Sequence, residues 1–230
     1  MCSGSKKKPA SPSKAKDSST PVKSKCQSCP AKAVKTGLGD DVDKEAAKCP
    51  SFAQNIQKLQ DNGWSVEYGP KGKGSYCNRT AKKIVIDENN KGNTTATLTT
   101  LAHESGHAGY SPEPYVKPDG LTKEQYARRN AGRSLKDEGE ATLTNIEVKE
   151  CLKKNGGKNI SVAGANAAKY EKIAKKYPDA KDRDKARKEI GDIFADNEHP
   201  STDPSKTYRQ YYEKPFRDFY DKLPEDKKTK

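Results

Sequence analysis

The first 48 residues most restrict what this 230-residue chain can fold into, because they contain no aromatic side chain. The first aromatic residue is Phe52, and the residues before it are mainly Lys, Ser, Pro and small side chains. Such a segment buries too little apolar surface to offset the entropy lost on ordering it. We therefore predict a disordered, basic, low-complexity tail over 1–48, a folded domain over 49–224 and a short charged tail over 225–230.

The tail also holds most of the excess positive charge. Between Met1 and Lys35 there are nine Lys and one acidic residue, so this stretch carries +8 of the total of +13. Such a tail binds anionic surfaces such as nucleic acid, lipid or bacterial cell wall loosely, although a plain flexible linker is the simpler interpretation. No nucleic-acid-binding module and no apolar stretch long enough to span a membrane is recognisable, so neither a specific nucleic acid partner nor a transmembrane segment is predicted. The sequence shows no hydrophobic region typical of a signal peptide, so none is predicted from it, and Cys2 directly after Met1 leaves open a lost lipoprotein or carrier N-terminus, or a cut from a longer protein.

The chain contains six cysteines, and their positions favour disulfides over a metal site. Cys26 and Cys29 form a C-x-x-C pair, but a four-cysteine zinc site needs a second tight pair, and a thioredoxin-like site needs a strand and a helix around it. We predict disulfides in an oxidising compartment, with the tail tied to the domain through Cys49 or Cys77, and with free thiols as the alternative.

Hydrophobic spacing in the rest of the chain predicts strands early and helices later, which is an α+β class that is mostly helical with a small early sheet. The turn-rich stretches between these segments contain no phosphate-binding loop. The predicted strands are 64–68, a strand at Tyr76 and 83–87. The predicted helices are 51–60, 95–110, 123–130, 134–154, 162–177, 182–196 and 205–223.

The motif that carries chemistry is H-E-x-x-H, on the predicted helix 95–110. His103 and His107 are four residues apart, so both imidazoles project from one helix face toward a single point. Two neutral imidazoles suit zinc, and Glu104 lies beside the metal position without being well placed to bind it. Its carboxylate is therefore free to act as general base toward a zinc-bound water. A chance match with two ordinary polar histidines is the alternative.

Two histidines leave a metal ion short of a third protein ligand. The longer pattern H-E-x-x-H-x-x-G-x-x-H fails, because Tyr110 stands where it needs glycine and Glu113 where it needs histidine, so the chain is not a metzincin. The acidic run within 136–142, on a later predicted helix, is the natural supplier of a carboxylate ligand. Two His, one Glu and a water would make a catalytic zinc site.

With this motif and the later acidic run, the chain resembles the Glu-zincin (gluzincin) metallopeptidases. These enzymes place a third-ligand Glu in an Asn-Glu-Gly or Asn-Glu-Ala context after the motif helix. The residues Asp137-Glu138-Gly139-Glu140-Ala141 are similar to that element. The resemblance implies a zincin-like fold and a Zn²⁺ cofactor held by His103, His107 and Glu138, with Glu140 as the alternative third ligand.

More narrowly, residues 82–148 resemble the metallopeptidase toxin domains of bacterial polymorphic toxins and type VI secretion effectors. The matching features are a strand, then Leu-Ala-His-Glu-x-Gly-His-Ala, then Asp-Glu-Gly-Glu-Ala. This resemblance implies secretion or delivery into a target cell's periplasm, a secretion-apparatus carrier and a cognate immunity protein. The distance in sequence from His107 to Glu138 is longer than in thermolysin-like enzymes.

Hydrolysis of an amide also needs a donor for the oxyanion besides the metal. His199 and Tyr208 are the candidate catalytic donors, although packing is the simpler explanation for most of the aromatic residues in this region. The sequence thus predicts a zinc metallopeptidase, and we expect a secreted antibacterial effector that acts on protein or peptide substrates. The alternatives are a peptidase of peptidoglycan cross-links and a non-enzymatic basic binding protein with a structural zinc.

Overall fold

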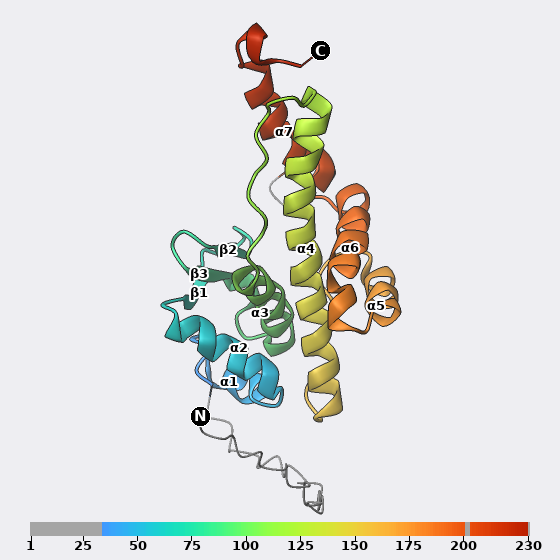
Figure 1. Cartoon of the computed structure of the whole chain (residues 1–230). Helices are drawn as coiled ribbons and strands as arrows, with labels where there is room; N and C mark the ends of the chain where they lie inside the picture. Colours follow the sequence, from blue (N-terminus) through green and yellow to red (C-terminus); the bar gives the residue numbers. More distant parts are fainter. Residues whose placement is uncertain (1–33, 201–202, 230) are drawn as a thin grey trace, which may run out of the picture. The chain divides into compact units, whose positions relative to one another are not determined.

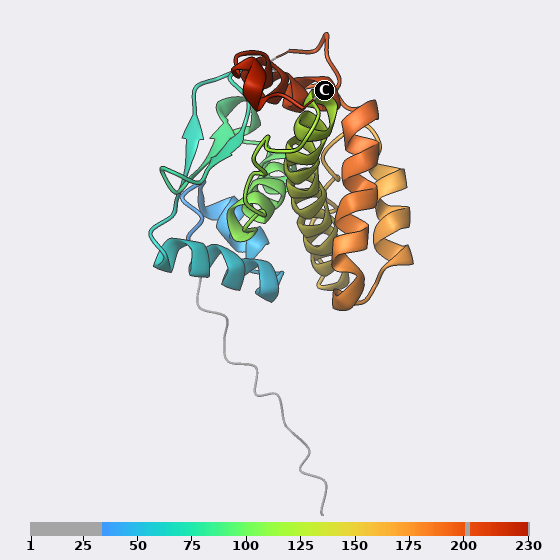
Figure 2. The same ribbon diagram turned by 45° about the horizontal axis from the view of Figure 1, so that its top comes forward.

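The structure, a computed structural model, describes residues 34–200 and 203–229, and the predicted mostly helical α+β class with a small early sheet is confirmed. The described residues belong to one compact unit, in which a single long helix, α4 (Lys123–Lys154), lies between two groups of elements (Figures 1 and 2). On one side of it lie the sheet and the helices α1 (Asp40–Ala46), α2 (Pro50–Asp61) and α3 (Thr94–Gly109), and on the other side lie α5 (Ala167–Lys176) and α6 (Arg183–Asn197). Among these residues, a search for helices with the length and hydropathy of a membrane span finds none.

The predicted tail is wrong for residues 34–48, which are part of the folded unit. Helix α1 (Asp40–Ala46) forms here, and Val42 on it is buried. The Asp43 carboxylate accepts hydrogen bonds from the backbone and the hydroxyl of Thr36, at 2.7 and 2.6 Å, which anchors the segment before the helix. Small aliphatic side chains are sufficient to fill this part of the core, so the lack of aromatic residues did not indicate where the folded domain begins. Residues 1–33 lie outside the described part.

The small sheet has the strand order β1-β3-β2 and supplies one wall of the later site. Strands β1 (Ser65–Gly69) and β3 (Lys83–Asp87) are parallel, whereas β2 (Tyr76–Asn78) pairs with β3 in the antiparallel direction. Strand β3 is central and buried, while β2 is an edge strand. Helix α2 (Pro50–Asp61) packs its apolar face into the same core as Ile84 and Ile86 of β3.

Helices α3 (Thr94–Gly109) and α4 (Lys123–Lys154) form the centre of the unit. The two helices predicted over 123–130 and 134–154 are one continuous helix of 32 residues, because a single Gly132 before Ser134, with no Pro, does not interrupt it. The predicted capping box at the start of α4 is present, with Thr122 and Gln125 bonded reciprocally.

The last three long helices are α5 (Ala167–Lys176), α6 (Arg183–Asn197) and α7 (Tyr208–Asp221). They pack against α4, with α5 and α6 on its other side and α7 along one end of it (Figures 1 and 2). Helix α5 begins later than predicted, because the chain at Gly164 takes a positive φ of 97° and interrupts the helical path. The predicted charged C-terminal tail packs back on the unit, since the Tyr220 hydroxyl bonds both the N–H and the C=O of Thr229.

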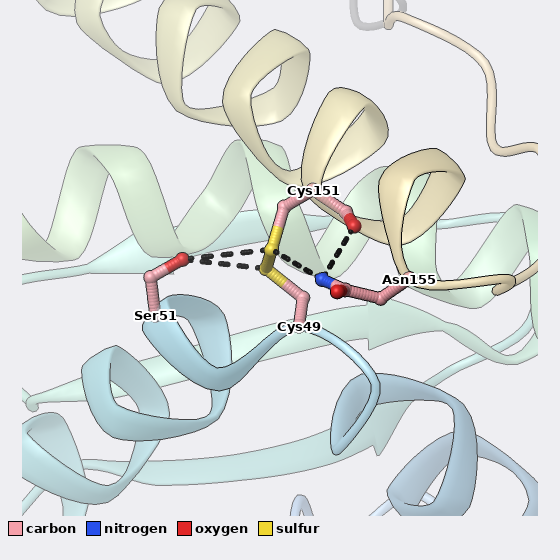
Figure 3. Close-up of a disulfide and its surroundings, with 4 residues drawn as sticks. All are labelled: Cys49, Ser51, Cys151 and Asn155. Atoms are coloured by element: carbon pink, nitrogen blue, oxygen red, sulfur yellow. Dashed lines mark hydrogen bonds between the residues drawn. A yellow bond between two sulfur atoms is a disulfide. The ribbon is translucent and has the colours of Figure 1, made fainter. Parts of the chain in front are cut away.

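Within residues 34–200 and 203–229, one disulfide links the residue before α2 to the last turns of α4, inside a single hydrophobic cluster. Cys49, before α2, is bonded to Cys151 near the end of α4, 102 residues away, with Ser51 and Asn155 beside the sulfurs (Figure 3). The predicted bond from the tail to Cys49 is therefore wrong, because Cys49 pairs within the domain. Cys77 has no disulfide partner among the described residues, and the predicted link from the tail to Cys77 involves cysteines outside them. The remaining three cysteines lie outside the described residues.

Candidate metal centre

Helix α3 carries the H-E-x-x-H motif on the side that faces α4. Asn93 caps the helix by accepting a hydrogen bond from the N–H of Ala96, and the motif begins nearly three turns later. Gly106, inside the motif, lies where the helices are closest, because a Cβ there would come within 2.6 Å of the Ala141 Cα. The glycine therefore lets α4 approach closely enough for its side chains to reach the histidines.

Three side chains from these two helices converge. The Oε2 atom of Glu138 lies 3.4 Å from Nε2 of His103 and 3.5 Å from Nε2 of His107. All three potential ligand atoms lie within 4.8 Å of one another, and the three residues are buried or nearly so. Burial alone would raise the pKa of Glu138, but His107 and His103 hold it well below its usual range. This group could hold a metal ion.

Glu140, the alternative third ligand, points elsewhere. Residues two apart on a helix lie about 200° apart around its axis, so Glu138 and Glu140 face different neighbours. Glu140 accepts hydrogen bonds from Arg183 at 2.7 Å and from Arg187 at 2.5 Å, both on α6. The carboxylate that joins the two histidines is therefore that of Glu138, while Glu140 fastens α4 to α6.

His107 and Glu138 each have further polar partners that hold their side chains in place. Asp137 lies 2.9 Å from Nδ1 of His107, and Arg79 donates both to Asp137, at 2.7 Å, and to the carbonyl of His107, at 2.6 Å. Tyr212 of α7 donates to Oε1 of Glu138 at 2.5 Å. Burial lowers the pKa of His107, but the carboxylates of Glu138 and Asp137 raise it well above its usual value.

Sequence reasoning missed Arg79 and Tyr212. Arg79 follows the edge strand β2, and Tyr212 is one of several tyrosines on α7, so neither stands in a recognisable motif. Asp137 lay inside the acidic run, but nothing in that run indicated that it would support a histidine. Within the described residues, Nδ1 of His103 is buried without a hydrogen-bond partner, while Nε2 of the same ring is turned toward Glu138.

A cavity of about 340 Å³ opens beside the three converging residues. Glu104 lines it, and burial raises the pKa of its carboxyl group. Cys77 also lines it, and burial raises the pKa of this thiol to about 12, so the sulfur is neutral near pH 7. Of the two candidate oxyanion donors, Tyr208 lines the cavity, whereas His199 is exposed and is not part of its wall.

In comparisons with known proteins, no protein family, curated protein or solved structure matches the chain.

Proposed function

We propose that this protein is a zinc-dependent metallopeptidase. The observation that supports the proposal most strongly is the convergence of His103, His107 and Glu138 beside a cavity that Glu104 also lines. Two imidazoles and one carboxylate make a donor set that suits zinc, and it is the set found in catalytic rather than structural zinc sites. When bound, a zinc ion lowers the pKa of a water molecule and polarises the carbonyl of the bond to be cleaved.

The chain's own groups would then carry the proton transfers. Glu104 follows His103 directly in sequence but does not belong to the converging group, so its carboxylate is available as general base. In this role it takes a proton from the attacking water and passes it to the leaving amine. Tyr208, which lines the cavity, would donate to the oxyanion.

The position of the sheet supports a peptide as the substrate. Strand β2 is at the edge of the sheet, and Tyr76 and Cys77 on it line the cavity. An unpaired strand edge binds an extended peptide through backbone hydrogen bonds. A peptide along β2 would therefore lie next to the metal-binding residues.

Two further features bear on whether the zinc is structural and on the compartment in which the protein acts. A structural zinc is held by four protein ligands, whereas three side chains converge here within the part of the chain that the structure describes. The Cys49–Cys151 disulfide supports an oxidising compartment, such as the outside of the cell or a periplasm. Action as a secreted antibacterial effector, with a carrier and an immunity protein as partners, is part of the proposal and rests on the sequence resemblance.

The test is the substitution Glu104→Gln, with Glu150→Gln as a matched control on the exposed face of α4. Purified proteins are compared for metal content, and for turnover of casein and of purified peptidoglycan sacculi. We expect E104Q to keep its metal and to lose at least about 10²-fold in turnover, while E150Q matches the wild type. Undiminished turnover by E104Q contradicts the mechanism, and release of muropeptides without casein cleavage moves the substrate to the cell wall.

A further inference from the structure

Arg133 is the feature of the cavity that the proposed mechanism does not use. It projects from α4 into the wall of the same cavity as the metal-binding residues. Arg79, the other arginine of that wall, is paired with Asp137 and donates to the carbonyl of His107. Arg133 has no carboxylate partner anywhere in residues 34–200 and 203–229, so the cavity contains one guanidinium whose charge is not neutralised by a neighbour.

The side chain of Arg133 is nevertheless held in place. Its Nε donates to the backbone carbonyl of Glu113, and its guanidinium carbon lies 4.0 Å from the centre of the Tyr115 ring. Both residues belong to the segment between α3 and α4, which Asn130 fastens to α4 by two hydrogen bonds with the backbone of Val116, at 2.9 and 3.2 Å. A guanidinium stacked on an aromatic face keeps its planar edge available for two parallel hydrogen bonds to a carboxylate.

The distance along α4 relates this group to the reaction site. Arg133 precedes Glu138 by five residues, which is a rise of about 7.5 Å along a helix. An extended peptide advances about 3.3 Å per residue, so the same distance spans about two residues of substrate. A group bound by Arg133 would therefore lie one or two residues from the bond positioned at the metal.

The carboxylates already present in the cavity do not compete for this arginine. Asp137 is paired with Arg79 and His107, and Glu138 is directed at the two histidines and Tyr212. Glu104 belongs to α3, opposite α4. An incoming carboxylate would thus find one cation that is fixed in position, accessible from the cavity and free of an internal counter-ion.

We propose that Arg133 recognises a carboxylate of the substrate, one or two residues from the scissile bond. This rests on the proposed peptidase function and deepens it, because it makes peptides with an acidic group near the cleaved bond the preferred substrate class. The carboxylate can come from an Asp or Glu side chain or from a free C-terminus that ends shortly after the bond. Both sources present the same planar anion to the guanidinium.

The test measures binding in the Glu104→Gln background, so that the peptides are not consumed. The probes are N-acetylated alanine hexapeptides with a single Glu or Gln at each internal position in turn, each made with a free and with an amidated C-terminus. Isothermal titration compares E104Q with the double variants E104Q/R133Q, E104Q/R133K and E104Q/R129Q. Arg129 lies one turn earlier on α4, is exposed and does not line this cavity, so it is the matched control.

We expect E104Q to bind at least one Glu or free-acid peptide about tenfold or more tightly than its uncharged counterpart. R133Q should abolish that ratio, R133K should retain part of it and R129Q should leave it unchanged. The ratio is taken within one protein preparation, so a loss of folded protein does not alter it. If the Glu peptides bind more tightly than the Gln peptides, the recognised group is a side-chain carboxylate. If only the peptides with a free C-terminus bind more tightly than the amidated ones, it is the C-terminal carboxylate.

Equal binding of the charged and uncharged peptides by E104Q, or a ratio that survives R133Q, overturns the inference. The wild-type enzyme separates this failure from failure of the proposed function. Cleavage by wild type without any preference for a carboxylate contradicts the role of Arg133 and upholds the peptidase. Carboxylate binding that depends on Arg133, with no cleavage of any peptide by wild type, contradicts the peptidase and upholds the recognition.

Discussion

The Tyr212 hydroxyl donates a hydrogen bond of 2.5 Å to Oε1 of Glu138, across 74 residues of sequence. The other carboxylate oxygen, Oε2, is the one that lies near Nε2 of His103 and of His107. The tyrosine therefore fixes the rotation of the carboxylate and leaves a single oxygen turned toward the histidines. Helix α7 thereby takes part in a site whose three main residues all come from α3 and α4.

Tyr212→Phe should weaken metal binding by about 10- to 100-fold, which is the usual effect of removing a partner that orients a ligand. The affinity is measured by competition with a chromogenic chelator. Tyr211→Phe, on the adjacent and more exposed tyrosine, is the control and should leave the affinity unchanged. An unaltered affinity in Y212F would mean that packing alone orients Glu138.

Glu138→Ala and Glu140→Ala should have opposite consequences. E138A removes one of the three converging groups, so purified E138A should contain little metal. E140A should keep its metal but lose stability, on the order of 2 kcal/mol, because Arg183 and Arg187 lose their shared partner in a largely buried position. Elemental analysis and urea unfolding measure the two effects. Metal loss in E140A instead of E138A would contradict the arrangement.

Tyr208→Phe should lower turnover by about 10²-fold or more if the hydroxyl donates to the oxyanion, because removing one such donor has an effect of this size. His199→Ala should leave turnover unchanged, since this side chain is exposed and lies outside the wall of the cavity. Steady-state kinetics on one peptide substrate, with metal content checked for both variants, measure the comparison. Equal turnover by Y208F and wild type would remove Tyr208 from the mechanism.

The double variant Cys49→Ser/Cys151→Ser should unfold at lower urea concentration, with a loss of roughly 2–5 kcal/mol. The bond closes a loop across a sequence separation of 102, so its removal gives the unfolded chain much more freedom. Metal content under native conditions should persist, because α3 and α4 meet directly at Gly106. Cys77→Ser is the control, and a comparable loss of stability in that variant would show a sulfur packing effect instead.

The lowered pKa of Glu198, a residue outside the metal centre, predicts that stability depends on pH. Burial raises the pKa of Glu198, but hydrogen bonds from Asn166 and Tyr170 outweigh this and lower it below the ordinary value of 4.5. A carboxyl group with a lowered pKa stabilises the fold above its unfolded-state pKa, and this contribution is lost as the pH falls through the folded-state pKa. Glu198→Gln should therefore be destabilising at pH 7, and the difference from wild type should shrink below about pH 4.5. Urea unfolding at pH 7 and pH 3.5 measures this, and a constant difference would contradict it.

Local patterns explain which features were predictable. The spacing of four residues predicted that His103 and His107 lie on one face of a helix. The alternating or continuous apolar residues predicted both strands of the parallel pair. The boundaries of α3 and β3 were correct to within about one residue. The boundary of the tail failed, because a few buried aliphatic side chains such as Val42 leave no distinctive mark in a polar segment.

The sequence by itself determined two imidazoles on one helix face and an acidic run on a later helix. Only the tertiary structure decided which carboxylate of that run meets the histidines, that Cys49 pairs with Cys151, and that Arg79 and Tyr212 support the site. The physical reason is that periodicity records which face of an element is buried, not what it is buried against. Contacts between residues tens of positions apart depend on how α3, α4 and α7 pack, and no local pattern encodes that packing.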